Sequence, residues 1–293
     1  MFDAIVAFIM GIIEGITEWL PISSTGHLIL SQTFLNFKGT SAQFPEMFNY
    51  VIQLGAIFAV IALFWNKLWP FKMPDKGAKV LSVNGGIFKA EQWTLWFKVL
   101  IATLPSALGL LIDSKVDALM YSDSGSPNRM GVIVISIALI FYGVLFILIE
   151  KMNNKRGMKI NTVEDISFKL ALFIGCFQLL AIIPGTSRSG ATIIGALILS
   201  VARPAAAEFS FFMAIPTMFG VSFLKIAQFL MENSISLREV GILLIGMIVS
   251  FLVSMACIKK LMEYVRRHDF SVFGYYRIAL GIVVFVVFTF ILK

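Results

Sequence analysis

The stretch EGITEWLPISSTGH, residues 14–27, lies in an apolar region near the start of the chain and decides the expected fold. It places two carboxylates, four hydroxyls and an imidazole among apolar neighbours. Pro21 lacks a backbone donor and is expected to end the helix before it. Within a membrane, such an interruption is tolerated only where the backbone faces protein or a wet cavity. The stretch therefore predicts a broken helix beside a polar site.

The composition predicts a polytopic membrane protein. Of 293 residues, 58% are hydrophobic and 14% are charged, whereas soluble domains have about 45–50% apolar and about 25% charged residues. The first residues carry no basic segment, so a cleaved signal peptide is not expected. We attribute the net charge of +7 to basic loops that set the membrane topology. The expected partner is therefore the lipid bilayer, and no nucleic acid is expected.

Six apolar segments have about the 20 residues that a helix needs to cross a bilayer. They are residues 44–65, 95–113, 130–150, 209–231, 239–261 and 274–292. Two further apolar regions, 4–30 and 170–200, are interrupted at Pro21 and at Pro184-Gly185. We expect these two regions to be re-entrant helical hairpins, because each interruption is followed at once by a cluster of hydroxyls.

Basic loops set the expected orientation. Residues 66–94, 151–169 and 259–273 are rich in Lys and Arg, which the positive-inside rule assigns to the cytoplasm. Both termini then lie outside, and the two hairpins enter from opposite sides.

Two hairpins of opposite orientation, each followed by three spans, predict an inverted-topology repeat. The whole chain, 1–293, is expected to be one all-α membrane domain, with repeat one over about 1–150 and repeat two over about 165–293. A shift of 163 residues aligns Pro21 with Pro184 and Ser24 with Ser187.

Glu14 and Glu18 are four residues apart, so they share one face of a helix. Two carboxylates at membrane depth are costly unless they bind a cation or share a proton. They predict an oxygen-ligand site for Mg²⁺ or Ca²⁺, or a general base. The alternative is a helix end with solvated glutamates at the membrane surface.

After Pro21 follow Ser23, Ser24, Thr25, Gly26 and His27. A helix that begins here presents free amides and the positive end of its dipole to an anion. His27 is one of only two histidines in the chain and is a candidate catalytic group, although a packed core histidine is the alternative.

The second interruption carries an arginine among hydroxyls. A planar guanidinium suits phosphate oxygens, although Arg188 could instead pair with a glutamate only to hold the hairpins together. The expected phosphate cradle consists of Gly185, Thr186, Ser187, Arg188, Ser189 and Thr192. Together the two interruptions predict a metal-assisted phosphoryl-transfer site near the membrane midplane.

Both motifs resemble those of the undecaprenyl-diphosphate phosphatase, or bacitracin resistance protein, family. They read Glu14-x-x-x-Glu18, then Pro21-x-Ser23-Ser24-Thr25-Gly26-His27, and Pro184-Gly185-x-Ser187-Arg188-Ser189-x-x-Thr192. The resemblance covers nearly the whole chain and implies a multi-pass enzyme of the bacterial inner membrane. It implies hydrolysis of undecaprenyl diphosphate to undecaprenyl phosphate, dependence on divalent cations and an active site facing the periplasm. Recycling of this lipid carrier serves peptidoglycan synthesis.

By this resemblance, Glu14 and Glu18 bind metal, and Glu18 also takes part in catalysis. Ser24 and His27 are the candidate nucleophile and its acid–base partner, and whether one of them or an activated water attacks stays open. Arg188 holds the diphosphate. A secondary transporter or flippase of a phosphate-bearing lipid is the alternative function, and a homodimer is one of the oligomeric states left open.

Overall fold

The computed structural model describes residues 1–41, 43–71, 89–122 and 127–291, and within them the chain forms helices and no strand. Five helical segments of the described residues are long and apolar enough to cross a membrane. They are α3 (Phe44–Leu63), α6 (Arg129–Arg156), α9 (Arg203–Glu232), α10 (Leu237–Arg267) and α11 with the following π-helical turn (Ser271–Ile291). The expected all-α, multi-pass membrane protein is therefore confirmed.

The sixth expected span, 95–113, lies within α5 (Ala90–Met120), which is not among these five. Lys98 interrupts the apolar stretch of α5 and is itself buried, donating from Nζ to the Glu164 carbonyl at 2.7 Å. Pro105 lies inside the same helix. Before α5 comes the short α4 (Trp65–Leu68), and residues 72–88 of the basic loop 66–94 lie outside the described residues.

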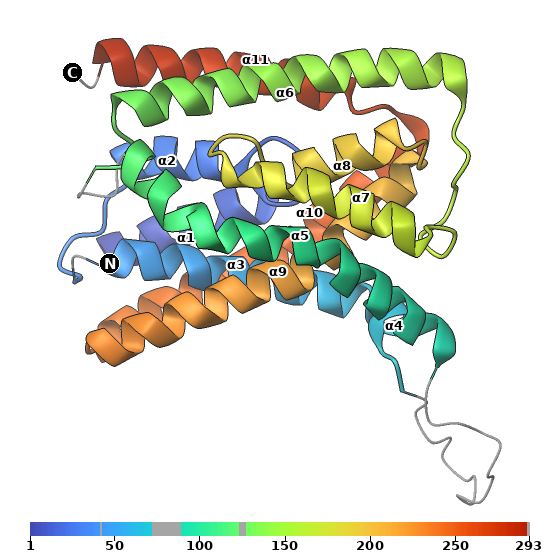
Figure 1. The fold of residues 1–293 in the computed structure, drawn as a ribbon. Coiled ribbons are helices and arrows are strands. Elements are labelled where there is room, and N and C mark those ends of the chain that lie inside the picture. Colours follow the sequence, from blue (N-terminus) through green and yellow to red (C-terminus); the bar gives the residue numbers. More distant parts are fainter. Residues whose placement is uncertain (42, 72–88, 123–126, 292–293) are drawn as a thin grey trace, which may run out of the picture.

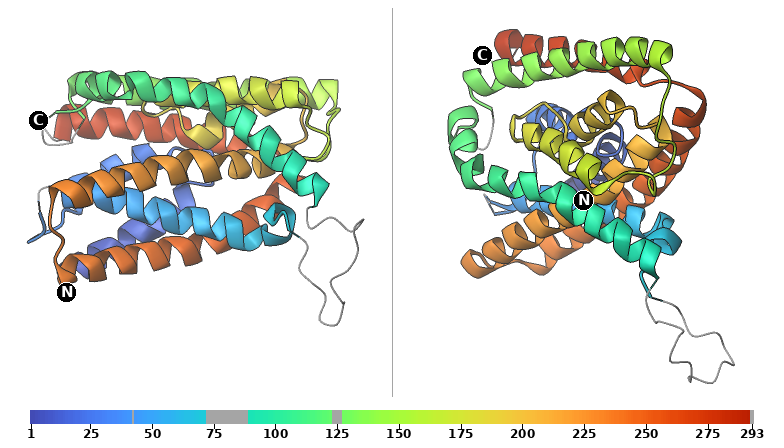
Figure 2. Two further views of the ribbon diagram at one scale, coloured as in Figure 1. Left: turned by 60° about the horizontal axis from the view of Figure 1, so that its bottom comes forward. Right: turned by 45° about the vertical axis from the view of Figure 1, so that its right-hand side comes forward.

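Short helices flank both expected interruptions. Pro21 lies between α1 (Phe2–Thr17) and α2 (Ser24–Phe34). Pro184 lies between the 3₁₀ turn Leu180–Ile182, which follows α7 (Phe168–Leu179), and α8 (Arg188–Ile198). Each of these helices is shorter than the ~20 residues that cross a bilayer. Of the four, α8 is the most deeply buried, and it lies among the other helices in Figure 2.

The long helices α6 and α11 run side by side in opposite directions along one face of the molecule (Figure 1). A Cβ added to Gly143 would lie 2.7 Å from the Gly274 carbonyl oxygen, and one added to Gly274 would lie 2.6 Å from that of Gly143. Such close backbone contact is typical of membrane helices with small residues at their interface. It brings the side chains of α11 close to the short helices.

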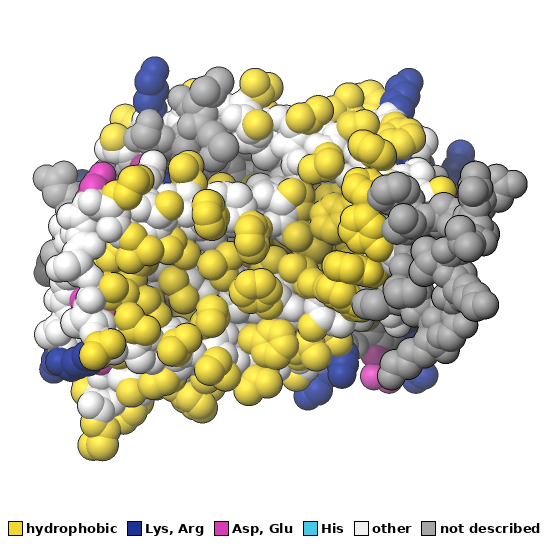
Figure 3. Space-filling view, turned by 90° about the horizontal axis from the view of Figure 1, so that it is seen from below, with side chains coloured by type: hydrophobic (Ala, Val, Ile, Leu, Met, Phe, Trp, Pro, Cys, Tyr) yellow, Lys and Arg dark blue, Asp and Glu magenta, His cyan; other side chains and the backbone are white. Residues whose placement is uncertain are grey.

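Both termini lie at one end of the molecule, and the connections from α6 to α7 and from α10 to α11 lie at the other (Figure 1). Figure 3 shows a broad hydrophobic surface between these ends, with charged side chains gathered toward the ends. This distribution fits a bilayer whose normal runs along the long helices.

Candidate active site

Each interruption ends in a serine that caps the next helix. The Ser23 hydroxyl accepts a hydrogen bond from the Gly26 amide at 3.3 Å, and the Ser187 hydroxyl accepts one from the Gly190 amide at 3.2 Å. Both serines have positive φ angles, 76° and 69°. This region is uncommon for residues other than glycine, and such strain concentrates at functional sites. The two interruptions are therefore built alike.

The matching caps correct the internal alignment expected from the prolines. Ser23 and Ser187 are 164 residues apart, whereas Pro21 and Pro184 are 163 apart. The second interruption has one more residue between its proline and its capping serine than the first. Aligning the two prolines therefore leaves the two capping serines one residue apart. In the corrected register, the first residue of α2 corresponds to the first residue of α8.

The extra residue in the second interruption falls where the backbone needs a glycine. Gly185 has a φ of 91°, and a Cβ on it would lie 2.7 Å from the Ile135 carbonyl oxygen of α6. Only glycine combines this backbone conformation with such a close approach. Thr186, which follows, is fully buried.

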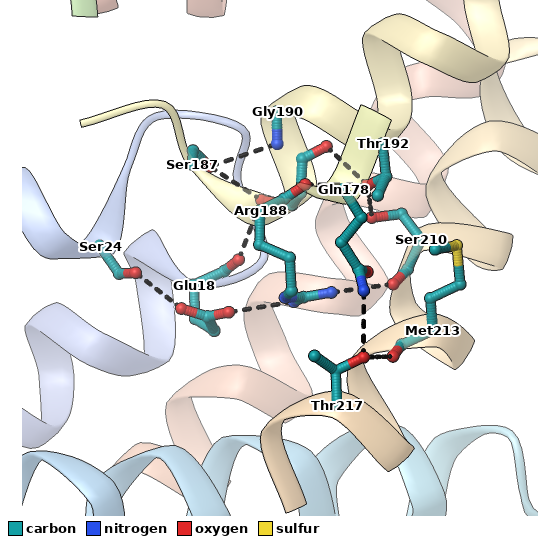
Figure 4. A network of polar contacts seen from close by, with 11 residues as sticks. Glu18, Ser24, Gln178, Ser187, Arg188, Gly190, Thr192, Ser210, Met213 and Thr217 are labelled. Atoms are coloured by element: carbon teal, nitrogen blue, oxygen red, sulfur yellow. Dashed lines mark hydrogen bonds and ion pairs between the residues drawn. The ribbon is translucent and has the colours of Figure 1, made fainter. Parts of the chain in front are cut away.

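Glu18 joins the two interruptions at the end of α1 (Figure 4). Its Oε1 accepts from Nη2 of Arg188 at 3.0 Å, and its Oε2 accepts from the Ser24 hydroxyl at 2.7 Å. The Ser189 hydroxyl donates to the Glu18 carbonyl at 3.3 Å. Glu18 is only 6% exposed, so these charge-assisted bonds act in a poorly solvated environment that strengthens them.

Arg188 is held in place by α9 as well as by Glu18. Its Nη1 donates to the Ser210 carbonyl at 3.1 Å. The Thr192 hydroxyl binds the Ser210 hydroxyl at 2.6 Å and donates to the Arg188 carbonyl at 3.0 Å. The Arg188 Nε is buried, with no hydrogen-bond partner in the described part of the chain. The fixed guanidinium thus retains a donor for an anionic ligand.

The hydroxyls of the second interruption also bind one another. Ser187 and Ser189 are joined by a hydrogen bond of 3.2 Å between their Oγ atoms. Ser189 is buried, whereas Ser187 is half-buried. Together with Arg188, they form one compact polar surface at the start of α8.

Glu14 lies one turn before Glu18 and is fully buried. Neither of its carboxylate oxygens has a hydrogen-bond partner within the described residues. A buried, unpaired carboxylate is costly, so this oxygen pair suits a proton or a hard cation such as Mg²⁺ or Ca²⁺.

The described residues contain no group of three or more His, Cys, Asp or Glu side chains that could hold a metal ion. A cation bound by Glu14 and Glu18 would therefore complete its shell from substrate oxygens and water. Mg²⁺ commonly binds in this way, through one or two carboxylates plus phosphates. The two unpaired oxygens of Glu14 are the observation that fits such a cation.

His27 lies on the side of the site that faces α11. Its Nδ1 is 2.8 Å from the Ser23 carbonyl oxygen, and its Nε2 is 2.7 Å from the Tyr276 hydroxyl. The hydroxyl of Ser24, by contrast, is bound to Glu18. Thr25 is exposed and Gly26 is buried beneath the cap.

Arg277 of α11 also belongs to this site, although the apolar segment 274–292 was expected to be an ordinary span. Its Nη1 donates to the Pro21 carbonyl at 3.2 Å, and its Nη2 donates to the carbonyls of Gly185 and Thr186, each at 2.8 Å. The side chain is fully buried. One guanidinium therefore links both interruptions. A lone cation within an apolar span is the sequence signal for such a residue.

The model of the family described as bacitracin resistance protein BacA matches residues 7–283. The chain belongs to this family. A relative from Acetivibrio thermocellus, named undecaprenyl-diphosphatase, is 51% identical over 285 residues, or 97% of each chain. A relative of the same name from Enterococcus faecalis is 50% identical over 279 residues, covering 95% of this chain and 94% of its own. The family resemblance of the two motifs is therefore confirmed.

A third undecaprenyl-diphosphatase, from Lactiplantibacillus plantarum, is 46% identical over 293 residues, covering 99% of this chain and all of its own. The name denotes an enzyme, and these names give no support to a transporter or flippase. In this BacA-family chain, the ion pair, the hydroxyl and the spare donor described above suit phosphoryl transfer.

Proposed function

We propose that the chain is a membrane phosphatase that hydrolyses undecaprenyl diphosphate to undecaprenyl phosphate and inorganic phosphate. The contact that carries this proposal is the Ser24 hydroxyl, which donates to Glu18 at 2.7 Å while Arg188 binds the other oxygen of the same carboxylate. A hydroxyl, a proton acceptor and a phosphate-binding cation thereby lie within one hydrogen-bonded group. The names of the relatives support the substrate.

In the proposed reaction, Arg188 binds the diphosphate with its spare donor, and the hydroxyls of α8 bind the remaining oxygens. Ser24 attacks the terminal phosphorus while Glu18 accepts its proton. The bond from that phosphorus to the bridging oxygen breaks, and the lipid monophosphate leaves as an anion. Water then hydrolyses the phosphoserine, which releases inorganic phosphate and restores Ser24.

Glu14 is the proposed main ligand of Mg²⁺ or Ca²⁺, with Glu18 as the second. When bound, this cation supplies positive charge that neutralises the diphosphate oxygens. His27, held by Tyr276 at 2.7 Å, is proposed to orient the start of α2 and to move a proton at its Nε2.

An inverted-topology repeat with two re-entrant hairpins in one membrane domain is the proposed architecture. Its support is the matching of contacts between the halves. Helix α1 of the first half packs on α10 of the second, and its counterpart α7 packs on α5, the counterpart of α10. Likewise α3 packs on α10, and its counterpart α9 packs on α5. The two serine caps add a match in local geometry.

The proposed location is the bacterial inner membrane, with the site open to the periplasm and a role in lipid-carrier recycling and bacitracin resistance. The basic loops 151–169 and 259–273 support this orientation, because positive loops favour the cytoplasm. A homodimer is not required by the proposed site, since its groups come from one chain.

The function is tested by supplying the purified protein in detergent with undecaprenyl diphosphate and either Mg²⁺ or Ca²⁺. Release of inorganic phosphate is expected, together with lipid monophosphate in equal amount. Failure to release phosphate with either cation, alongside movement of the lipid across liposomes, would refute the enzyme and favour a transporter.

A further inference from the structure

A hollow of about 580 Å³ lies between the ends of α3 and α10, and residues of α4 and α9 also line it. Its volume is in the range of small-molecule sites. None of its lining residues belongs to the site at Glu18 and Arg188. Four cations line it: Lys67, Lys259, Arg266 and Arg267.

One of these cations is already neutralised. Lys67 lies 2.6 Å from a Glu208 carboxylate oxygen and 3.9 Å from one of Glu164. The Glu208 side chain is 11% exposed and that of Lys67 is 47% exposed, so the carboxylate of this lining pair is largely buried and the ammonium is partly solvated. The charges of the pair cancel and leave the ligand chemistry to the remaining cations.

The other three cations all come from the last turns of α10. Lys259, Arg266 and Arg267 are exposed, and no salt bridge joins any of them to the part of the chain that the structure describes. Glu263 lies on the same helix within one turn of each, so it offsets part of their charge. A net positive rim remains.

Apolar side chains form another wall of the same hollow. Phe64 from the end of α3 and Met262 from α10 lie beside the cationic rim. Because α3 and α10 are long enough to cross a membrane, the ends of these helices lie at headgroup depth. Figure 3 shows Lys and Arg side chains at the margin of the hydrophobic surface. A ligand here meets cations on one side and hydrocarbon on the other.

We propose that this hollow binds a phosphate-bearing anion, with the headgroup of an anionic phospholipid as its occupant. Two neighbouring guanidiniums match phosphate oxygens in geometry, and basic pockets between membrane helices suit anionic headgroups. The apolar wall favours a lipid over free phosphate, because it would contact the first methylenes of the acyl chains. Binding here is independent of the proposed hydrolysis.

The test is native mass spectrometry of the full-length protein titrated with phosphatidylglycerol, with phosphatidylcholine of the same acyl chains and with inorganic phosphate. Phosphatidylglycerol is expected to bind in preference to both. The R266Q/R267Q double variant should weaken that binding about 30-fold, since each of the two cations contributes of the order of 1 kcal/mol near an anionic headgroup and ~1.4 kcal/mol is tenfold.

The matched control is K155Q/R156Q, which removes the same charge from exposed residues at the end of α6, outside the hollow. It should leave phosphatidylglycerol binding unchanged. Equal weakening in both double variants would overturn the site, because attraction to the overall positive charge would then suffice. If inorganic phosphate at the same concentration displaces the lipid, the hollow binds anions but a phospholipid is not its preferred occupant. The melting temperature of each variant shows whether weaker binding comes from lost folding. The K259Q variant, which removes the third exposed cation of the hollow, should also weaken phosphatidylglycerol binding.

Discussion

Arg188 and Glu18 are 170 residues apart in the sequence, and their side chains form an ion pair of 3.0 Å. The two side chains are 11% and 7% exposed. Removing one partner of such a pair leaves a poorly solvated charge, which is costly. The pair therefore both closes the contact between the interruptions and holds the guanidinium for a ligand.

Replacing Arg188 should abolish phosphate release. R188A loses the cation, and R188K keeps the charge but cannot reproduce bonds to Glu18 and Ser210 together with a spare donor. Both variants are expected to lose at least about 100-fold in kcat, the scale for removing one donor to a transition state. The measurement is phosphate release from undecaprenyl diphosphate at saturating substrate.

The matched control for Arg188 is R129A. Arg129 is exposed at the start of α6 and makes no contact with the site. The kcat of R129A should stay within a factor of two of the parent value, which corresponds to a change of ~0.4 kcal/mol in activation free energy. Near-normal turnover in R188A would show that the diphosphate is held elsewhere.

The S24A variant tests the proposed nucleophile. It removes the hydroxyl that donates to Glu18, while the cap from Ser23 is left intact. Turnover should fall by about 10³-fold or more, and acid-stable phosphate should appear on the parent protein but not on S24A after reaction with labelled diphosphate. The control S31A alters a hydroxyl further along the same helix. Substantial turnover in S24A would exclude Ser24 as the nucleophile and leave His27 or an activated water.

The E14Q variant tests the unpaired carboxylate. Without divalent cation, E14Q should melt at a higher temperature than the parent, because it no longer buries a charge without a partner. The parent should gain stability on addition of Mg²⁺ or Ca²⁺, as ligand linkage requires, and E14Q should not. Differential scanning fluorimetry in detergent gives both results.

Glu46, which is exposed, provides the matched control E46Q. Glu239 is unsuitable as a control, since it belongs to a capping box at the start of α10 and accepts from the Ser41 amide at 2.9 Å. An equal response to cations in E14Q and E46Q would rule out Glu14 as a ligand.

The R277Q variant tests the link between the interruptions. Arg277 donates to three carbonyls, and each hydrogen bond from a charged group contributes about 1.5–3 kcal/mol. R277Q should therefore lower the free energy of unfolding by at least ~2 kcal/mol and also reduce kcat. R277K should restore part of the stability but little of the activity, because one ammonium cannot span both interruptions. If R277Q is destabilised but its kcat is unchanged, Arg277 contributes to stability alone and not to catalysis.

Proline and hydroxyl patterns were enough to locate the two interruptions and to bring Glu18 together with Arg188. Periodicity and spacing could not reveal Ser210 or Tyr276, because each lies in an apolar helix and acquires its role only through tertiary packing. Ser210 contributes a backbone carbonyl, a group that every residue carries. Arg277 did leave a signal, as a cation in an apolar segment.

The one-residue error in the internal alignment has a similar origin. Proline restricts the backbone locally, whereas the cap is set by a serine hydroxyl and a positive φ. The distance between these two features differs between the interruptions, and the three-dimensional structure shows that the two serine caps share one geometry.

Arg277 also bears on how the protein is made. Membrane helices enter the bilayer during synthesis, and α11 follows both interruptions in the chain. Until α11 arrives, the carbonyls of Pro21, Gly185 and Thr186 lack their shared donor. A nascent chain that ends before α11 therefore still lacks the guanidinium that binds both interruptions together.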